Sequence, residues 1–276
     1  MMQITKTVAE LNQALDEKTD IAFVPTMGAL HNGHVSLVKK ARSIGRTVVV
    51  SVFVNPTQFN DQTDLVKYPR TLEADAELLS AAGADILFAP SVDEVYPHDA
   101  AQAQGGEWEY LAQVMEGARR PGHFSGVVQV VSRLFDLVKP RWAMFGEKDF
   151  QQLAIIRSMV AERSMEVEIV GCPIVRGADG LALSSRNALM NEGERTAAPL
   201  IYKELSALKA KIESTPSAEI EKLIEESIEN LKNNKYLCPE YIEVVDPVSL
   251  RATDDHHSFR ICAAVRCGSV RLIDNV

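Results

Sequence analysis

Two histidines three residues apart, His31 and His34, are the first residues in this chain whose spacing suggests chemistry. They follow a short apolar run at residues 21–24 and a turn marked by Pro25 and Gly28, and they stand where helical spacing of apolar residues begins. The N-terminus of a helix attracts anions because unpaired N–H groups and the positive end of the helix dipole meet there. The ligand that this arrangement suits is a phosphate chain.

Two other interpretations of the histidine pair stay open at this point. His-x-x-His is half of a metal site, although no third ligand of suitable spacing stands nearby. The two residues could also be ordinary surface histidines at a helix start. The stretch therefore has to be judged together with the rest of the chain.

Further polar donors come later in the chain. Lys148 follows a predicted strand and offers a point charge for phosphate. Ser184, Ser185 and Arg186 add two hydroxyls and a planar guanidinium. None of these is an obvious covalent nucleophile. An enzyme with these donors would therefore work mainly by positioning its substrates and by stabilising charge that develops on phosphorus.

Structural alternatives exist for these donors when each is taken singly. Lys148 has acidic neighbours on both sides and could form a surface ion pair, and the serine segment could cap a helix. Gln58 and Gln152 could be satisfied polar side chains at the ends of a strand and a helix. The common phosphate-loop, dinucleotide-binding, metalloprotease and Gly-x-Ser-x-Gly motifs are absent from the sequence, which disfavours those enzyme classes.

Composition excludes several other classes. The chain has 276 residues, 46% hydrophobic and 24% charged, which is an ordinary globular balance. A net charge of −9 argues against nucleic acid as a partner, since binding to a phosphate backbone needs cationic patches. The longest apolar run, Val48 to Val54, is too short to span a bilayer, and no membrane partner is expected. Four cysteines without a Cys-x-x-Cys pair predict reduced thiols in a cytoplasmic protein.

The elements that must position the donors alternate along the first half of the chain. Thr7 and Glu10 predict a capping box that opens a first helix. The pattern then predicts strands at 21–24, 47–54, 86–88, 142–145 and 167–170, and helices from about 34 and at 71–82, 127–138 and 150–163. Strands that alternate with helices across short turns indicate an α/β fold with a parallel, doubly wound sheet.

Polar segments follow four of the predicted strands, at 27–34, at 55–58, at 146–149 and after Val170. Ligands of such sheets bind beyond the carboxyl ends of the strands. We therefore expect these segments to converge on one edge and form the site.

The alternation of predicted strands and helices ends after Pro173. A polar segment at 176–187 precedes two long helical patterns, at 191–211 and 217–232, and strands at 241–245, 259–265 and 270–273. We expect a domain of residues 1–176 that holds the phosphate ligand, and a smaller α+β domain of residues 177–276 that closes over the site. Residues 97–106 have little pattern and predict a surface excursion.

Seven segments, taken in order, closely resemble the pantothenate synthetase (pantoate–β-alanine ligase) family. They are Pro25–His34, Phe53–Phe59, Tyr68–Thr71, Arg120–Phe124, Phe145–Gln152, Asp179–Asn187 and Arg271–Asn275. That family belongs to the nucleotidylyltransferase superfamily, so the resemblance implies a Rossmann-like fold of that type. It also implies an ATP-dependent ligase in which the pantoate carboxylate attacks the α-phosphorus of ATP, giving pantoyl adenylate and pyrophosphate. The amine of β-alanine then attacks the acyl carbon, giving pantothenate and AMP.

The resemblance also implies roles for individual residues, carried over by position. His34 would donate to the phosphate as charge builds, Lys148 would bind phosphate, and Asp149 would face the ribose. The residues implied in catalysis are His31, His34, Lys148, Ser184, Ser185 and Arg186. The residues implied in ATP binding are Met27, Gly28, Ala29, Leu30, His31, Asn32, Gly33, His34, Gly146, Glu147, Lys148, Asp149, Val175, Leu183, Ser184, Ser185 and Arg186. The residues implied in binding the other substrates are Asn55, Gln58 and Gln152, and Gln58 would also reach β-alanine.

Three positions complicate this assignment. Thr57 stands where methionine is common, and Ala74 stands where some relatives carry an acid, while Asp75 remains as a candidate contact to metal or amine. Mg²⁺ is expected as the partner of ATP, without a cage of protein ligands, because this ion is coordinated mainly by substrate phosphates and water. No tightly bound cofactor is expected. A homodimer is also expected. The alternatives are another adenylylating enzyme of the superfamily and a non-catalytic nucleotide-binding module.

Overall fold

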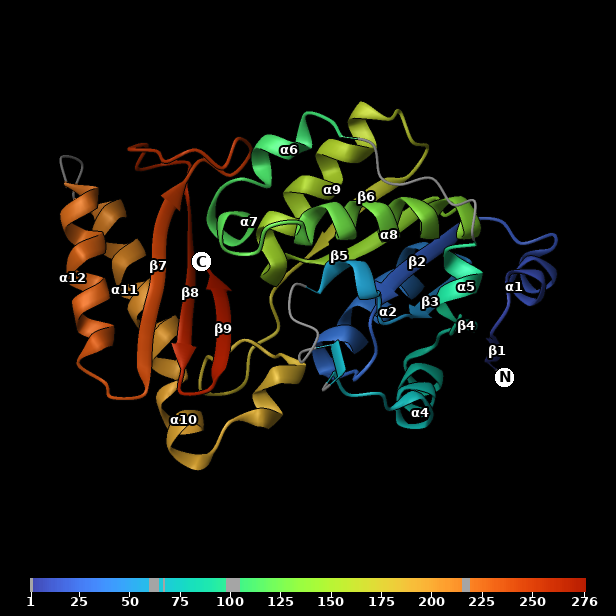
Figure 1. The fold of residues 1–276 in the computed structure, drawn as a ribbon, viewed down its shortest axis with the longest axis horizontal. Coiled ribbons are helices and arrows are strands. Elements are labelled where there is room, and N and C mark those ends of the chain that lie inside the picture. The colour runs from blue at the N-terminus through green and yellow to red at the C-terminus, as the bar shows by residue number, and fades with distance from the viewer. Residues whose placement is uncertain (1, 60–64, 67, 98–104, 215–218) are drawn as a thin grey trace.

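The computed structural model describes residues 2–59, 65–66, 68–97, 105–214 and 219–276 (Figure 1). Its larger part is a six-stranded parallel sheet in the order β1-β4-β3-β2-β5-β6. The strands are β1 (Gln3–Thr5), β2 (Ile21–Thr26), β3 (Thr47–Val52), β4 (Ile86–Phe88), β5 (Trp142–Gly146) and β6 (Glu168–Cys172). The predicted doubly wound parallel sheet is confirmed. Strand order reverses between β2 and β5, which is where ligands of such sheets bind.

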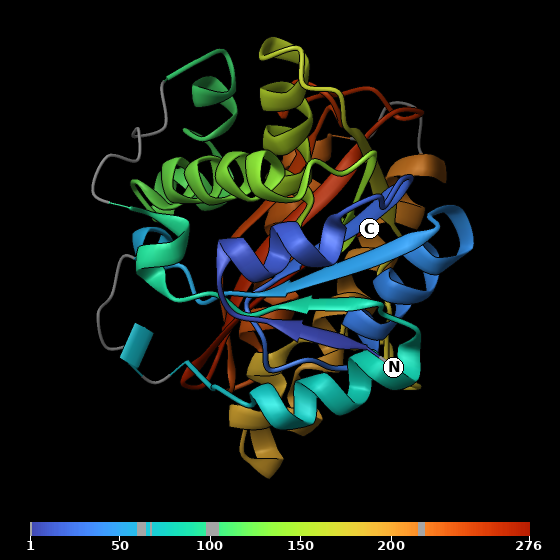
Figure 2. The same cartoon turned by 90° about the vertical axis from the view of Figure 1, so that its right-hand side faces the viewer.

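Helices cover both faces of this sheet. On one face α1 (Val8–Leu15), α8 (His123–Val138) and α9 (Phe150–Glu162) pack on the strands, and on the other α2 (Asn32–Ile44) and α4 (Leu72–Ala82) do so. Figure 2 shows the strands lying between α8 and α4. The short helices α5 (Val92–Val95), α6 (Trp108–Leu111) and α7 (Met115–Arg119) connect β4 to α8.

The smaller part has an antiparallel sheet in the order β7-β8-β9, as the helix-then-strand pattern predicted. Its strands are β7 (Leu237–Val245), β8 (Arg260–Cys267) and β9 (Val270–Asn275), and its helices are α10 (Glu192–Ala197), α11 (Pro199–Ser214) and α12 (Ile220–Lys232). One face of this sheet packs on α11 and α12 (Figure 1). Side chains of its other face belong to the core around α8 and α9. The two parts therefore share one apolar core, and the smaller part has a second apolar core of its own.

Local sequence explains most element boundaries. The Thr7–Glu10 capping box is confirmed, because each side chain bonds to the other residue's backbone N–H. Gly83 ends α4 with a φ of 94°, in the left-handed region that glycine adopts without strain. No helix in the described ranges is long and apolar enough to cross a membrane.

Some predicted boundaries were wrong. The predicted helix at 191–211 is two helices, because Pro199 lacks an N–H and starts α11 instead of continuing α10. Helix α8 begins at His123, before the predicted start at Val127, and β1 was not predicted because three residues carry too little periodicity. Most of the excursion predicted at 97–106, and the start of the helix predicted at 217, lie outside the described residues.

Candidate active site

A cavity of about 240 Å³ opens beyond the carboxyl ends of β2, β3 and β5, at the point where the strand order reverses. The segments that follow these strands, together with the segment after β6, form its walls. The predicted site residues that line it are Met27, His31, Gly33, His34, Asn55, Gln58, Gly146, Lys148, Asp149, Gln152, Val175, Leu183, Ser184, Ser185 and Arg186. The expected convergence of the polar segments is therefore observed.

Five of the predicted residues do not line the cavity: Gly28, Ala29, Leu30, Asn32 and Glu147. They lie in, or directly beside, the turns that carry the lining residues. A site prediction made from contiguous motifs includes them because sequence does not distinguish a turn's lining residues from its supporting ones.

The two histidines form the N-terminus of α2. The Nδ1 atom of His31 accepts from the N–H of Gly33 at 3.1 Å, and the Nδ1 atom of His34 accepts from the N–H of His31 at 3.3 Å. Their rings lie 4.2 Å apart between centroids. The histidines thus build a capping box of their own, a use that the sequence did not suggest.

Burial favours the neutral form of both rings. Burial lowers the pKa of His34 to about 3, and the neighbouring His31 ring adds to that effect because two protonated rings would repel each other. Burial also lowers the pKa of His31. A neutral imidazole whose Nδ1 accepts a hydrogen bond carries its proton on Nε2. Each ring therefore offers one N–H donor while its Nδ1 lone pair is engaged by the backbone.

Asp75 holds the turn that leads into α2. Its carboxylate oxygens accept from the N–H groups of Ala29 at 3.0 Å and Leu30 at 2.8 Å, and from the Thr71 hydroxyl at 3.2 Å. The side chain is 1% exposed and does not line the cavity. The expectation that Asp75 could contact metal or amine is thus replaced by a supporting role in this turn, where Gly28 has a φ of 87°.

The amides after β3 are held in a network. The Nδ2 atom of Asn55 donates to Oε1 of Gln58 at 3.3 Å and to the Gly126 carbonyl at 3.1 Å, and its Oδ1 accepts from the Tyr96 hydroxyl. Thr57, which departs from the family pattern, is exposed and does not line the cavity. Ala74 is exposed as well. Neither departure therefore alters the wall of the cavity.

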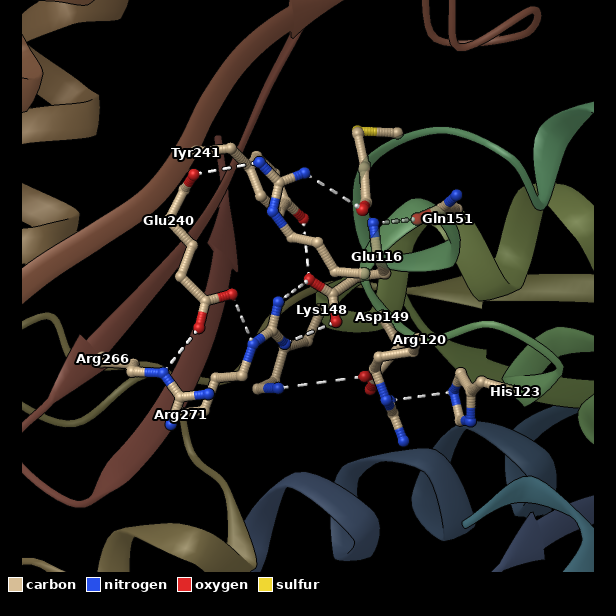
Figure 3. A network of polar contacts seen from close by, with 12 residues as sticks. Glu116, Arg120, His123, Lys148, Asp149, Gln151, Glu240, Tyr241, Arg266 and Arg271 are labelled. Carbon is tan, nitrogen blue, oxygen red and sulfur yellow. Dashed lines mark hydrogen bonds and ion pairs between the residues drawn. The ribbon is translucent and has the colours of Figure 1, made fainter. Parts of the chain in front are cut away.

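Lys148 and Ser184 line the cavity and also make the local contacts that were named as structural alternatives, an ion pair and a cap. The Nζ atom of Lys148 lies 3.9 Å from Oδ1 of Asp149, and Oγ of Ser184 accepts from the N–H of Arg186 at 3.3 Å. Figure 3 shows Lys148 and Asp149 beside Arg120 and His123. Among the described residues, no group of three or more His, Cys, Asp or Glu side chains is arranged to hold a metal ion.

His123 connects this region to the segment after β3. Burial lowers its pKa to about 4, and the charge of Arg120 contributes. The Nη1 atom of Arg120 lies 3.0 Å from Nε2 of His123, so this neutral ring accepts from the guanidinium and donates from Nδ1 to the Gln58 carbonyl at 2.8 Å.

One wall of the cavity was missed by the sequence reasoning. Helix α8 contributes Val127, Val130, Val131 and Leu134 to the lining. The available signal was the run of apolar residues on more than one face of this helix, since a helix that only covered a sheet would carry a single apolar stripe. These side chains give the cavity an apolar wall in addition to its polar donors.

Comparisons with known proteins agree on one family. The family model described as "Pantoate-beta-alanine ligase" matches residues 3–276. Proteins named pantothenate synthetase from Bacteroides fragilis and Bacteroides thetaiotaomicron are 49% and 52% identical, over 100% and 97% of this chain and 98% and 94% of their own lengths. The crystal structure of pantothenate synthetase from Thermus thermophilus is similar with a TM-score of 0.92 at 44% identity, covering 100% of this chain and 99% of that one. A ligase from Francisella tularensis, solved in complex with "Beta-gamma ATP and Beta-alanine", has a TM-score of 0.83 at 35% identity and covers 100% of this chain and 97% of its own.

Proposed function

The chain belongs to the pantoate–β-alanine ligase family, and we propose that the cavity at the β2–β5 edge is where its two reaction steps take place. The enzyme condenses pantoate with β-alanine to give pantothenate, using ATP and releasing AMP and pyrophosphate by way of pantoyl adenylate. The observation that carries the assignment of the site is the convergence of three donor groups on one cavity: the α2 histidines, Lys148, and the segment Leu183–Arg186.

In the first step, a carboxylate oxygen of pantoate attacks the α-phosphorus of ATP and the bond to the pyrophosphate oxygen breaks. We assign His34, through its Nε2–H, and Lys148 to the phosphoryl oxygens on which charge develops. Ser184, Ser185 and Arg186 are assigned to the departing pyrophosphate, which gains negative charge as it leaves. Because His34 stays neutral at physiological pH, it acts as a hydrogen-bond donor and not as a general acid.

Pantoate is assigned to the region of the cavity between the side chains of Gln58 and Gln152, which both line it. Its dimethyl group suits the apolar wall of α8, where burial of methyl groups is favourable. In the second step, the amine of β-alanine attacks the acyl carbon, the bond to the AMP oxygen breaks, and the ammonium proton is lost. Gln58 is assigned to orient that amine.

The nucleotide is assigned to the turn at Gly146–Asp149 and to the main chain of Val175, with Asp149 facing the ribose. We propose that Mg²⁺ arrives with ATP as part of the substrate. The ion keeps several waters and binds chiefly to phosphates, so this mode of binding needs no carboxylate cage from the protein. Its charge would neutralise the phosphate oxygens, while the residues above orient them.

Three broader assignments are also proposals. A domain boundary near residue 176 is supported by the end of β6 at Cys172 and by a second apolar core that begins at Leu181. A cytoplasmic location is supported by four free cysteines. A homodimer is supported by the prevalence of two-fold dimers among soluble oligomers, and light scattering coupled to gel filtration tests it.

Pyrophosphate exchange tests the placement of the first step. With pantoate and ATP but no β-alanine, the enzyme is expected to carry labelled pyrophosphate into ATP, since adenylation is reversible. Lys148→Ala should reduce this exchange strongly, whereas His257→Ala, at an exposed histidine of the smaller part, should leave it unchanged. Undiminished exchange in Lys148→Ala would remove this lysine from the reaction.

A further inference from the structure

The segment Arg271–Asn275 forms most of β9 and has no part in the reaction as assigned above. Three of its polar side chains nevertheless bind residues of other segments of the chain. Arg271 binds Glu116, Asp274 binds Arg176, and Asn275 binds the turn that carries Lys148. We propose that Asn275 is a positioning residue for Lys148, and that it sets the place of this amine from the opposite part of the molecule. The inference rests on the proposed role of Lys148 in adenylation.

One amide group holds the lysine turn. The Nδ2 atom of Asn275 donates to the carbonyl of Glu147 at 2.9 Å and to the carbonyl of Lys148 at 3.0 Å. The turn itself is a single 3₁₀ turn, Glu147–Asp149, without a side-chain cap at its start. Because short turns of this kind have few internal bonds, the two bonds from Asn275 fix where the backbone of Lys148 lies.

The Asn275 side chain makes its hydrogen bonds through its N–H groups and, within the described part of the chain, none through its amide oxygen. The residue is 2% exposed, and its Oδ1 is buried without a hydrogen-bond partner among the described residues. An unpartnered buried oxygen is unfavourable, so the amide is useful here for its N–H groups. An aspartate of the same shape would instead turn oxygen toward two carbonyl oxygens.

The end of β9 is itself rigidly attached, so it can serve as a reference point. Arg176 donates to both carboxylate oxygens of Asp274, at 2.7 and 2.9 Å, and to the Asn275 carbonyl at 3.0 Å. The Arg176 guanidinium also stacks on Tyr202, 3.8 Å from the ring centroid. Arg176 directly follows Val175, so one strand end braces two segments of the cavity wall.

The test separates the two chemical steps. Adenylation is measured by single-turnover quench with ATP and pantoate, and amide formation is measured with supplied pantoyl adenylate and β-alanine. Asn275→Ala should slow adenylation by roughly 10- to 100-fold, the scale expected when a catalytic group is misplaced by about 1 Å. Amide formation should stay within about two-fold, because Lys148 is assigned to the phosphoryl transfer.

Gln151→Ala is the matched control. Gln151 is also a buried amide that donates to two carbonyls, those of Leu111 and Val114, but neither carbonyl belongs to the turn that carries Lys148. This variant should lower the melting temperature without slowing adenylation per folded molecule. If Asn275→Ala behaves like Gln151→Ala, or slows both steps equally, the proposal is wrong.

A double-mutant cycle supplies the second readout. In the Lys148→Ala background, Asn275→Ala should cause little further loss of adenylation, since the group it positions is gone. Full additivity would overturn the proposal, whereas normal adenylation in Lys148→Ala alone would overturn the role of the lysine instead. Asn275→Asp serves as a second variant, with an equal or larger loss expected. Failure of both Asn275 variants to fold would assign the residue to stability and contradict the positioning role.

Discussion

At the scale of the residue, the structure assigns two uses to each imidazole of the α2 pair. One nitrogen completes the start of the helix, and the other remains as a donor at the cavity. The engaged Nδ1 atoms cannot serve as bases at the same time. The chemistry available to His31 and His34 is therefore hydrogen-bond donation to oxygen.

His34→Ala is expected to slow adenylation by about 10²–10³, which corresponds to roughly 3–4 kcal/mol of barrier. The loss arises because the Nε2–H donor contributes most when charge has developed on phosphorus. Rapid-quench kinetics measures the step directly. His34→Asn retains an acceptor near the position of Nδ1, so it separates loss of the donor from loss of the helix cap. An adenylation rate close to that of the unmodified enzyme in both variants would contradict the role of His34.

Stability should depend on pH through His123, which is 7% exposed. Its pKa is about 4 in the folded chain and about 6.5 when unfolded, so between these values only the unfolded chain binds the proton. Lowering the pH through this window therefore favours unfolding, by about 1.4 kcal/mol per pH unit for this group. Urea denaturation between pH 7 and 4 measures the slope. His123→Gln should show a shallower slope, and an identical slope in the two proteins would show that His123 does not titrate in this way.

At the scale of the element, close packing of α8 on the segment after β3 fixes the side of the cavity that we assign to pantoate. Gly126 on α8 lies against the backbone of Thr57 and Gln58, so that no side chain fits between them. The same helix supplies apolar lining from its next turns. The position of α8 therefore sets both the polar and the apolar contacts assigned to pantoate.

Two alanine substitutions of glycine should differ in their effect on stability and in the substrate whose KM rises. Gly126→Ala forces the backbone of Thr57 and Gln58 apart, so it should cost about 1–3 kcal/mol of stability and raise KM for pantoate. Gly146→Ala meets no atom within 4 Å and has a φ of −74°, so the fold should tolerate it. Because Gly146 lines the cavity, its new methyl group should raise KM for ATP without changing the melting temperature. Thermal melts measure the predicted changes in stability and steady-state kinetics measures the predicted changes in KM for both variants. A lower melting temperature of Gly146→Ala would contradict this account.

At the scale of the whole molecule, a charged network ties the two parts together (Figure 3). The carboxylate of Glu116 on α7 accepts two bonds from Arg271 on β9, at 2.6 and 2.7 Å, and one from the Tyr241 hydroxyl at 2.9 Å. Burial opposes ionisation of Glu116, but the bonds and charge of Arg271 outweigh it and lower the pKa. Arg271 also binds Glu240 at 2.9 Å, within the smaller part.

Glu116→Gln should destabilise the chain by about 3 kcal/mol, because it keeps the shape of the side chain but leaves the largely buried Arg271 guanidinium with only the Glu240 carboxylate as a charged partner among the described residues. Urea denaturation measures the change. Glu229→Gln is the control, since Glu229 pairs with Lys232 on the exposed face of α12 and its loss should cost less than about 0.5 kcal/mol. Equal effects of the two substitutions would show that the contact between the parts contributes no more than a surface pair.

The sequence by itself determined the parts of this protein that depend on local pattern. Alternating apolar runs and helical spacing predicted the parallel sheet, and polar segments after strands predicted the edge where the cavity lies. The ordered motifs identified the family. These inferences succeed because apolar periodicity and turn residues act over a few neighbouring positions.

Only the tertiary structure decided which of those residues face the cavity and which residues support them. Asp75 holds a turn that lies 45 positions before it in the chain, and Asn275 reaches the Lys148 carbonyl across 127 positions. The α8 wall likewise depends on how that helix packs. No local pattern encodes such partners, because a hydrogen bond or a packed face between distant segments forms only once the whole chain has brought them together.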